Sequence, residues 1–409
     1  MLHLNAALHD MDVYASKTIS QAAKADPKIL NLSIGEPEFG PPEHLLSAIE
    51  GADLTLENFL QSVKRYEQSR GSPELRAAIS KWYERRYGLT VDPEREIMVT
   101  HGGVEAITLA LLSCTEASDA VAVTNPAYML YKRAIIALGR NPVSFERPAA
   151  EEEYRALIST NRQFSHGMRG AKALIVNSPE NPTGYVLTKR EWRELLEAAE
   201  RTGTWVIHDE VYDTMSFTRD HVPVRCLDDL GERTVLINSF SKKFGTPGLR
   251  MGWIVAHPDL IEIAMKAHDY LYLGVNILYE RVANRLLTDP NIEQWFTSNN
   301  RMMKRRADEA IKILKLETGF DWQRLPHGGM FLFPNVRHFH SMMPPEYRSM
   351  DVSVGEAVAR YLLDKERVAT IPGAIYGSQG QENLRLILCP PAATFANALK
   401  RLADAFVPA

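Results

Sequence analysis

The stretch Val235-Leu236-Ile237-Asn238-Ser239-Phe240-Ser241-Lys242 joins an apolar segment to a short polar segment that ends on a lysine. The apolar residues 235–237 predict a buried strand, which delivers the polar segment to its carboxyl end. In open α/β sheets, ligands bind at that edge. A lysine held there, partly out of water, has a lowered pKa and can attack an aldehyde. A surface lysine is the competing interpretation, and it would prevail if Lys242 stood alone.

Short apolar runs alternate with helical patterns on both sides of this stretch. Strands are expected at residues 97–100, 120–124, 173–177, 205–208, 234–238 and 253–256. Helices are expected between them, for example at 104–112 and 189–201. Near-continuous apolar strands separated by helices are typical of a mostly parallel sheet with helices on both faces. The sequence therefore predicts an α/β fold.

The last third of the chain has a different pattern. Long helical stretches at 261–288, with a break near Gly274, and at 291–317 precede strands at 330–333 and 384–388. We therefore expect a large domain at residues 46–285 and a smaller α+β domain at 286–409. Residues 1–45 are expected to form an N-terminal arm and part of the small domain. Residues 341–350, with two adjacent prolines, are expected to form a mobile loop that could serve as a lid.

The composition is that of an ordinary globular protein. The chain has 409 residues, of which 45% are hydrophobic and 24% charged, and its net charge is -4. Such a charge supplies no positive field for nucleic acid or an anionic membrane. The three cysteines form no CxxC pair, which fits a reducing compartment. Neither a signal peptide nor a long apolar span is evident, so we expect a cytoplasmic protein with no membrane or nucleic-acid partner.

Polar residues around the lysine suit a phosphate group. Arg250 follows eight residues after Lys242, within a segment that contains three glycines, and Ser239 and Ser241 precede the lysine. Hydroxyls and a guanidinium bind phosphate oxygens, and glycines let the backbone approach. Three further residues lie at or near expected strand ends, namely Asp209, Tyr212 and Asn181. Taken singly, Asp209 could be a helix cap, Tyr212 a core residue and Asn181 a turn residue.

With these motifs the sequence resembles the class I and II aminotransferases of pyridoxal 5'-phosphate (PLP) fold type I, the aspartate aminotransferase superfamily. The resemblance covers essentially the whole chain, from Asn31 to Leu386. Residues 181–184 match the family's NPTG motif, 209–212 its DExY motif and 239–252 its lysine signature. Thr246 replaces a usual apolar residue of that signature, a change expected to affect local packing more than chemistry.

The resemblance implies a role for each residue around the cofactor ring. Lys242 would hold PLP as a Schiff base and, once freed, would move a proton to and from the substrate Cα. Asp209 would keep the pyridine nitrogen cationic, which improves the ring as an electron sink. Tyr212 and Asn181 would hydrogen-bond the phenolic oxygen. Tyr128 would stack on the ring, although a core aromatic is nearly as good an interpretation.

The resemblance also places the phosphate and the substrate. The phosphate would meet Ser239, Ser241, Arg250 and a helix start at Gly103 and Val104, where the family often has other residues. Tyr66, otherwise a plain surface tyrosine, would reach the partner's phosphate, which implies a homodimer with shared active sites. Arg385 would clamp the substrate carboxylate, with Asn181 and the backbone of Gly35 beside it.

Transamination between an amino acid and a 2-oxo acid is the reaction that the resemblance favours. Elimination, replacement, cyclisation or oxidation of an amino acid on the same scaffold is the alternative, because the same lysine can remove a Cα or Cβ proton. A transcription regulator of this fold is disfavoured, because residues 31–37 begin the match almost at once. No metal is expected, since His338 and His340 lack a third ligand. The absence of arginine from residues 270–280 weakly disfavours aspartate and glutamate as the main donor and favours aromatic, aliphatic or unusual side chains.

Overall fold

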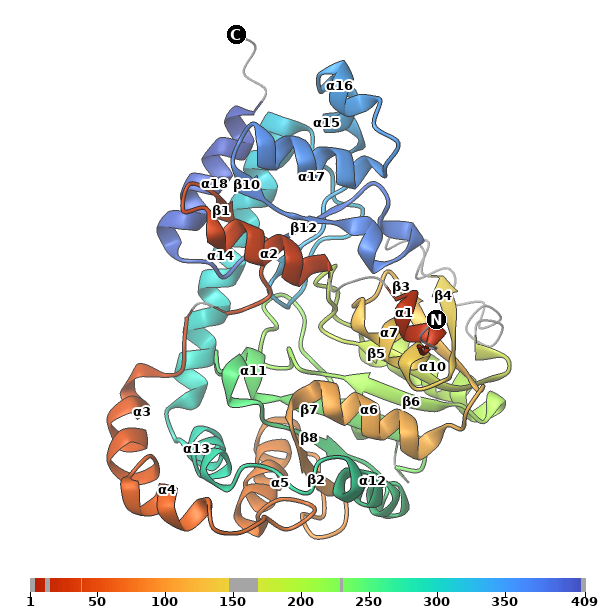
Figure 1. The fold of residues 1–409 in the computed structure, drawn as a ribbon, viewed down its shortest axis with the longest axis vertical. Coiled ribbons are helices and arrows are strands. Elements are labelled where there is room, and N and C mark those ends of the chain that lie inside the picture. Colours follow the sequence, from red (N-terminus) through yellow and green to blue (C-terminus); the bar gives the residue numbers. More distant parts are fainter. Residues whose placement is uncertain (1–3, 12–14, 38, 147–167, 229–230, 406–409) are drawn as a thin grey trace.

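A computed structural model describes residues 4–11, 15–37, 39–146, 168–228 and 231–405 (Figure 1). Its largest element is a seven-stranded sheet with the order β2-β8-β7-β6-β5-β3-β4. The strands are β2 (Ile97–Thr100), β3 (Ala120–Asn125), β4 (Asn141–Glu146), β5 (Ala171–Asn177), β6 (Trp205–Asp209), β7 (Thr234–Ser239) and β8 (Gly252–Val255). β8 runs antiparallel to both of its neighbours, and every other adjacent pair in this sheet is parallel. The predicted mostly parallel sheet is confirmed, although sequence analysis did not anticipate β4.

Helices cover both faces of this sheet, which explains the continuous apolar strands. On β7, Leu236 belongs to one core cluster, whereas Val235 and Ile237 belong to the cluster on the other face. Helices α5 (Pro73–Tyr87), α10 (Lys189–Thr202) and α13 (Ile277–Thr288) contribute to the first cluster. Helices α6 (Gly102–Cys114), α7 (Leu130–Ala137) and α12 (Pro258–Leu271) contribute to the second. The sheet is therefore buried on both sides.

A second group of elements, drawn mainly in blue in Figure 1, lies above the carboxyl ends of the parallel strands. It combines α14 (Ile292–Thr318), α17 (Val354–Asp364) and α18 (Ala392–Asp404) with a sheet of β11 (Ile371–Pro372), β12 (Leu384–Ile387) and β9 (Phe331–Leu332). β1 (Leu30–Asn31) pairs with β10 (Val368–Ala369), so residues near the N-terminus join this group. α2 (Ala15–Ala25) also contacts β1 and β10. The domain boundaries at residues 45 and 285 stay a prediction.

The expectation of a mobile loop at residues 341–350 is wrong for most of that segment. Residues Arg337–Met342 form α15 and Pro345–Arg348 form α16. Met343 is buried, and Tyr347 packs edge-on against Tyr361 with ring centroids 5.2 Å apart. The two prolines suggested a loop, but Pro345 occupies the first position of α16, where a missing N–H costs nothing.

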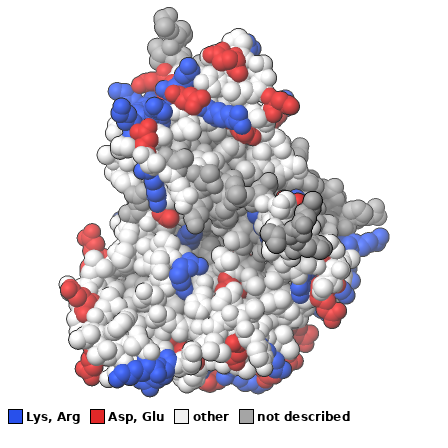
Figure 2. All heavy atoms as spheres, in the orientation of Figure 1, with Lys and Arg blue, Asp and Glu red and all other residues white. Residues whose placement is uncertain are grey.

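Other short helices connect these elements. They are α1 (Ala6–His9), α3 (Glu43–Ala48), α4 (Leu56–Ser62), α11 (Phe240–Lys243), a π-helix at Ile49–Asp53 and 3₁₀ turns at Val224–Leu227, Pro247–Leu249, Gly373–Tyr376 and Ser378–Gly380. None of the helices in the described part of the chain is long and apolar enough to cross a membrane. On the face drawn in Figure 2, the Lys and Arg side chains (blue) are interspersed with the Asp and Glu side chains (red).

Candidate active site

A cavity of about 390 Å³ opens between the seven-stranded sheet and the second group of elements. Every site residue predicted from the sequence except Tyr66 lines it. These lining residues are Gly35, Gly103, Val104, Tyr128, Asn181, Asp209, Tyr212, Ser239, Ser241, Lys242, Arg250 and Arg385. Tyr66 is 78% exposed on the outer surface. The tertiary structure thus gathers residues separated by up to 350 positions.

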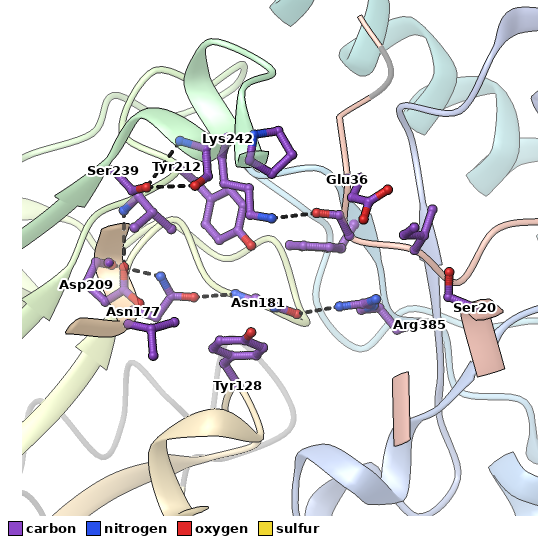
Figure 3. A pocket seen from close by; sticks show the side chains of 18 of the residues that line it. Ser20, Glu36, Tyr128, Asn177, Asn181, Asp209, Tyr212, Ser239, Lys242 and Arg385 are labelled. Carbon is purple, nitrogen blue, oxygen red and sulfur yellow. Dashed lines mark hydrogen bonds between the residues drawn. The ribbon is translucent and has the colours of Figure 1, made fainter. Parts of the chain in front are cut away.

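Lys242 points into the cavity from the short helix α11, which follows β7 directly (Figure 3). Ser239 caps this helix, because its hydroxyl accepts a hydrogen bond from the backbone N–H of Ser241. The Lys242 amine donates to the backbone oxygen of Gly35 at 2.6 Å. Burial lowers the pKa of Lys242 to about 8, because desolvation disfavours the charged amine. About a tenth of the amine is therefore neutral and nucleophilic at pH 7, far more than for an ordinary lysine.

Asp209 lies at the end of β6, deep in the cavity. Its carboxylate accepts hydrogen bonds from the Tyr131 hydroxyl at 2.6 Å and from the backbone N–H of Val211 at 3.2 Å. The Asn177 amide donates to the backbone oxygen of Asp209 at 2.8 Å. Burial raises the pKa of Asp209 to about 6, against the effect of the tyrosine hydrogen bond. No described residue forms an ion pair with this carboxylate, so it can accept a cationic ligand group.

Arg385 joins three distant segments at the opposite side of the cavity. Its guanidinium donates to the side-chain oxygen of Asn181 at 3.2 Å and to the backbone oxygen of Ser33 at 2.7 Å. It also lies 4.7 Å from the centroid of the Phe331 ring. A guanidinium carries five N–H donors, and these two bonds leave others available. The arrangement suits a carboxylate that enters between Arg385 and Lys242.

Hydroxyl and backbone donors gather at a third side of the cavity. The Ser239 hydroxyl lies 3.0 Å from that of Ser241, and Arg250 donates to the backbone oxygen of His101 at 3.3 Å. Arg250 therefore sits beside the N-terminus of α6, where free N–H groups favour an anion. Gly102 has φ +78°, a backbone conformation that favours glycine, and a Cβ there would lie 2.7 Å from the Arg250 guanidinium. Together these groups can hold a phosphate.

The aromatic residues of the cavity include one that sequence analysis missed. Tyr128 and Tyr212 line the cavity as expected, and Tyr212 packs edge-on against Phe331. Tyr131, in the first turn of α7, also lines it and contacts Asp209. Tyr128 lies just before α7, so helical spacing in the sequence could not have indicated that both tyrosines face the cavity. Thr246, the departure from the family signature, donates to the backbone oxygen of Phe240, so it acts in the turn after α11.

A buried polar network lies behind the cavity, on the far side of α11. Lys243 is fully buried and forms an ion pair with Asp213 at 2.8 Å. Its amine also donates to the Asn238 side chain at 2.6 Å and lies 4.6 Å from the Trp253 ring centroid. The two adjacent lysines therefore have opposite surroundings, since one faces the cavity and the other satisfies a buried carboxylate.

The same network contains the one group of potential metal ligands found among the described residues, formed by His208, Glu210 and His221. Glu210 lies 3.0 Å from His221 and accepts a hydrogen bond from the Tyr83 hydroxyl at 2.5 Å. The Val224 backbone N–H donates to Nδ1 of His208 at 3.3 Å. Burial lowers the pKa of His208 and of His221 to about 4. Hydrogen bonds between neutral histidines and their neighbours account for this group.

Comparison with known proteins agrees with this arrangement. The model of the family described as "Aminotransferase class I and II" matches residues 27–406. The aspartate aminotransferase of Pyrococcus abyssi is 28% identical over 92% of this chain and 90% of its own. The arginine–pyruvate transaminase of Pseudomonas aeruginosa is 28% identical over 97% of this chain and 94% of its own. Among solved structures, N-succinyldiaminopimelate aminotransferase from Mycobacterium tuberculosis superposes with a TM-score of 0.84, at 26% identity over 98% of this chain and 99% of its own.

Proposed function

The chain belongs to the class I and II aminotransferases and is a PLP-dependent enzyme of that family, and from this premise we propose how its residues hold the cofactor and the substrates. Lys242 carries PLP covalently through its amine. The enzyme moves an amino group from an amino acid to a 2-oxo acid. One observation carries the proposal. The buried Lys242 amine, with its lowered pKa, and the buried Asp209 carboxylate, which forms no ion pair with a described residue, line the same cavity.

The residues of the cavity fit PLP at two chemically distinct places. Asp209 offers a buried carboxylate to the cationic ring nitrogen, and this pairing would lower its raised pKa again. The serine hydroxyls, Arg250 and the start of α6 offer donors to the phosphate. When bound, the cofactor supplies the electron sink that stabilises negative charge at the substrate Cα.

The remaining roles follow from the positions of the side chains. Arg385 binds the substrate carboxylate and, with the cavity wall, holds the Cα–H bond toward Lys242. The Lys242 amine would take this proton from Cα in the donor half-reaction, and it would supply a proton to Cα of the second substrate in the reverse half-reaction. Asn181 accepts a hydrogen bond from Arg385 and lines the same cavity as Tyr212, so it is placed between the substrate carboxylate and the cofactor. Tyr131 helps to keep Asp209 ionised.

The test of this function is the absorption spectrum of the purified holoenzyme, recorded before and after addition of each common amino acid. Transamination predicts that the visible band of the lysine-bound cofactor is lost with at least one donor. A 2-oxo acid added afterwards should restore that band. Release of ammonia with the band retained would reject transamination in favour of elimination. Absence of any cofactor band after incubation with PLP would reject the proposal itself.

The pH dependence of cofactor uptake follows from the lowered pKa of Lys242. The pKa falls from 10.5 to about 8, so the neutral amine becomes the main form above about pH 8. We expect the rate of PLP capture by the apoenzyme to rise about tenfold per unit between roughly pH 6 and pH 8, and then to level off. Stopped-flow absorbance measures this rate. A profile that still rises steeply above about pH 9 would mean an ordinary, solvated lysine.

Replacement of Tyr131 by phenylalanine should weaken cofactor binding. The change removes the hydrogen bond to Asp209 and so raises the pKa of that carboxyl further above its ordinary value. Loss of a hydrogen bond to a charged group costs about 1.5–3 kcal/mol, which corresponds to a loss of affinity of roughly tenfold or more. Fluorescence titration with PLP measures the effect. Tyr128→Phe, in the same cavity, is the control and should retain affinity; equal losses in both variants would contradict the role of Tyr131.

The proposed enzyme is a homodimer in the cytoplasm. An exposed apolar strip supports the dimer, and it comprises Leu56, Phe59, Leu60, Val63, Tyr66, Tyr270, Leu271 and Leu273. Its two segments are joined by a hydrogen bond from Ser69 to Asp269 at 2.9 Å. Such contiguous exposed apolar residues are typical of an interface. Sedimentation should give twice the chain mass of 46.1 kDa, and a monomer at working concentration would reject the shared-site proposal.

The proposed location in the cytoplasm rests on the cysteines. Three free cysteines fit a reducing compartment.

A further inference from the structure

Helix α2 and the segment after β1 form a wall of the cavity that the proposed cofactor and carboxylate sites leave unassigned. Ser20, Gln21 and Lys24 of α2 line this wall together with Glu36. In Figure 3, Ser20 and Glu36 lie on the side of the cavity opposite Asp209, with Glu36 beyond Lys242 and Ser20 beyond Arg385. A substrate whose carboxylate meets Arg385 would extend its side chain toward this wall. These residues are therefore placed to contact the distal end of that side chain.

The charged residues of the cavity fall into two sets. Four have roles in the proposed function, namely Asp209, Lys242, Arg250 and Arg385. The other two, Lys24 and Glu36, form an ion pair with each other at 3.1 Å. The unassigned wall therefore presents one positive and one negative group side by side. Glu36 also lies close enough to Lys242 to favour the charged form of that amine, which puts its carboxylate near the reacting atoms.

The Lys24–Glu36 pair is open to ligands. Their side chains are 57% and 51% exposed, and an ion pair in such contact with water is weak. A ligand with opposite charges can enter between them and keep both satisfied. Ser20 adds a polar group nearby, because it is buried and its hydroxyl has no hydrogen-bond partner among the described residues. The wall therefore offers a ligand one cationic group, one anionic group and one hydroxyl.

We propose that Lys24 and Glu36 form a specificity subsite for amino donors whose side chain ends in both an ammonium and a carboxylate group. The inference rests on the proposed function and names the substrate class of the same site. Glu36 receives the distal ammonium and Lys24 the distal carboxylate. A purely acidic or basic side chain would satisfy one of the two residues and displace the other into water. Diamino dicarboxylic acids are the class with this distal end.

The experiment uses three donors that differ only at the distal end. They are 2,6-diaminoheptanedioate, 2-aminoheptanedioate, which lacks the distal amine, and lysine, which lacks the distal carboxylate. For each donor, kcat/KM and the calorimetric dissociation constant of the holoenzyme are measured. The wild-type protein should prefer the first donor over each of the other two by about 1.5- to 5-fold, the range expected for exposed charge pairs.

Two variants test the assignment of each charge. Glu36→Gln should remove the preference over 2-aminoheptanedioate, whereas Lys24→Met should remove the preference over lysine. Lys315→Met is the matched control, because Lys315 pairs with Asp321 at 3.4 Å with similar exposure outside the cavity; it should change neither preference.

The possible results separate this inference from the proposed function. Equal affinities for the three donors in the wild-type protein would overturn the subsite, as would variants that leave both preferences unchanged. Turnover of leucine or phenylalanine with no distal preference would reject the subsite alone. If no donor is turned over, the proposed reaction fails, but calorimetry still decides whether the distal preference exists.

Discussion

Replacement of Lys242 by alanine is expected to abolish transamination while the protein stays folded. The Lys242 amine makes one recorded hydrogen bond, to the backbone oxygen of Gly35, and its lowered pKa reflects the cost of burying its charge. Its removal therefore costs little stability. The chemistry, in contrast, loses both the covalent attachment of PLP and the group that moves the Cα proton. Loss of the proton-transfer role alone lowers rates by about 10²–10⁴-fold, and loss of the attachment adds to this.

The Lys242→Ala variant is measured by single-turnover absorbance with saturating PLP and by thermal unfolding. Lys315→Ala is a suitable control, because Lys315 is an exposed lysine that does not line the cavity. We expect a rate at least about 10⁴-fold below wild type and a melting temperature close to that of the apoenzyme. Activity within tenfold of wild type would show that Lys242 does not carry the reaction.

Replacement of the next residue, Lys243, by methionine should instead lower the free energy of unfolding strongly. Lys243 is the buried cation that neutralises Asp213, and its amine also satisfies the Asn238 side chain. Methionine retains much of the packing but leaves the Asp213 carboxylate buried without a counter-charge. Removing one partner of a buried ion pair costs about 3–5 kcal/mol. For a protein whose total stability is on the order of 5–15 kcal/mol, this is a large loss.

Denaturant unfolding of the apoenzyme measures this effect, with circular dichroism as the probe. The double variant Lys243→Met/Asp213→Asn removes both charges and should recover part of the lost stability, because no uncompensated charge stays buried. An unfolding midpoint equal to that of wild type in the single variant would mean that water or a rearranged histidine compensates Asp213. If the double variant is less stable than the single one, the ion-pair explanation is wrong.

The two lysines illustrate how far the sequence could go. By residue type Lys242 and Lys243 are equivalent, and the choice of Lys242 rested on its place in a family signature. The structure supplies the physical reason for the choice. On α11 adjacent side chains point in different directions, so Lys242 faces the cavity while Lys243 faces the core behind it. The orientation of α11 depends on how β7 packs in the sheet.

Some features could not be predicted because they depend on contacts between distant residues. Tyr131 binds Asp209 only because α7 packs beside the end of β6. The subsite residue Lys24 reaches the cavity because α2 contacts β1 and β10. Residues 341–350 were expected to form a loop because their two prolines are common in turns as well as in the first turn of helices. None of these contacts has a local pattern in the sequence.

The alternation of buried strands and helices could be predicted from the sequence, and so could the polar residues that end those strands. Both properties are local, since they depend on hydrophobic periodicity and on short motifs around Asn181, Asp209 and Lys242. Three other features follow from the tertiary structure: Arg385 meets Asn181, the Asp209 carboxylate forms no ion pair with a described residue, and α2 closes a wall of the cavity. These depend on how the second group of elements packs over the sheet, where the free energy comes from non-local burial and charge placement.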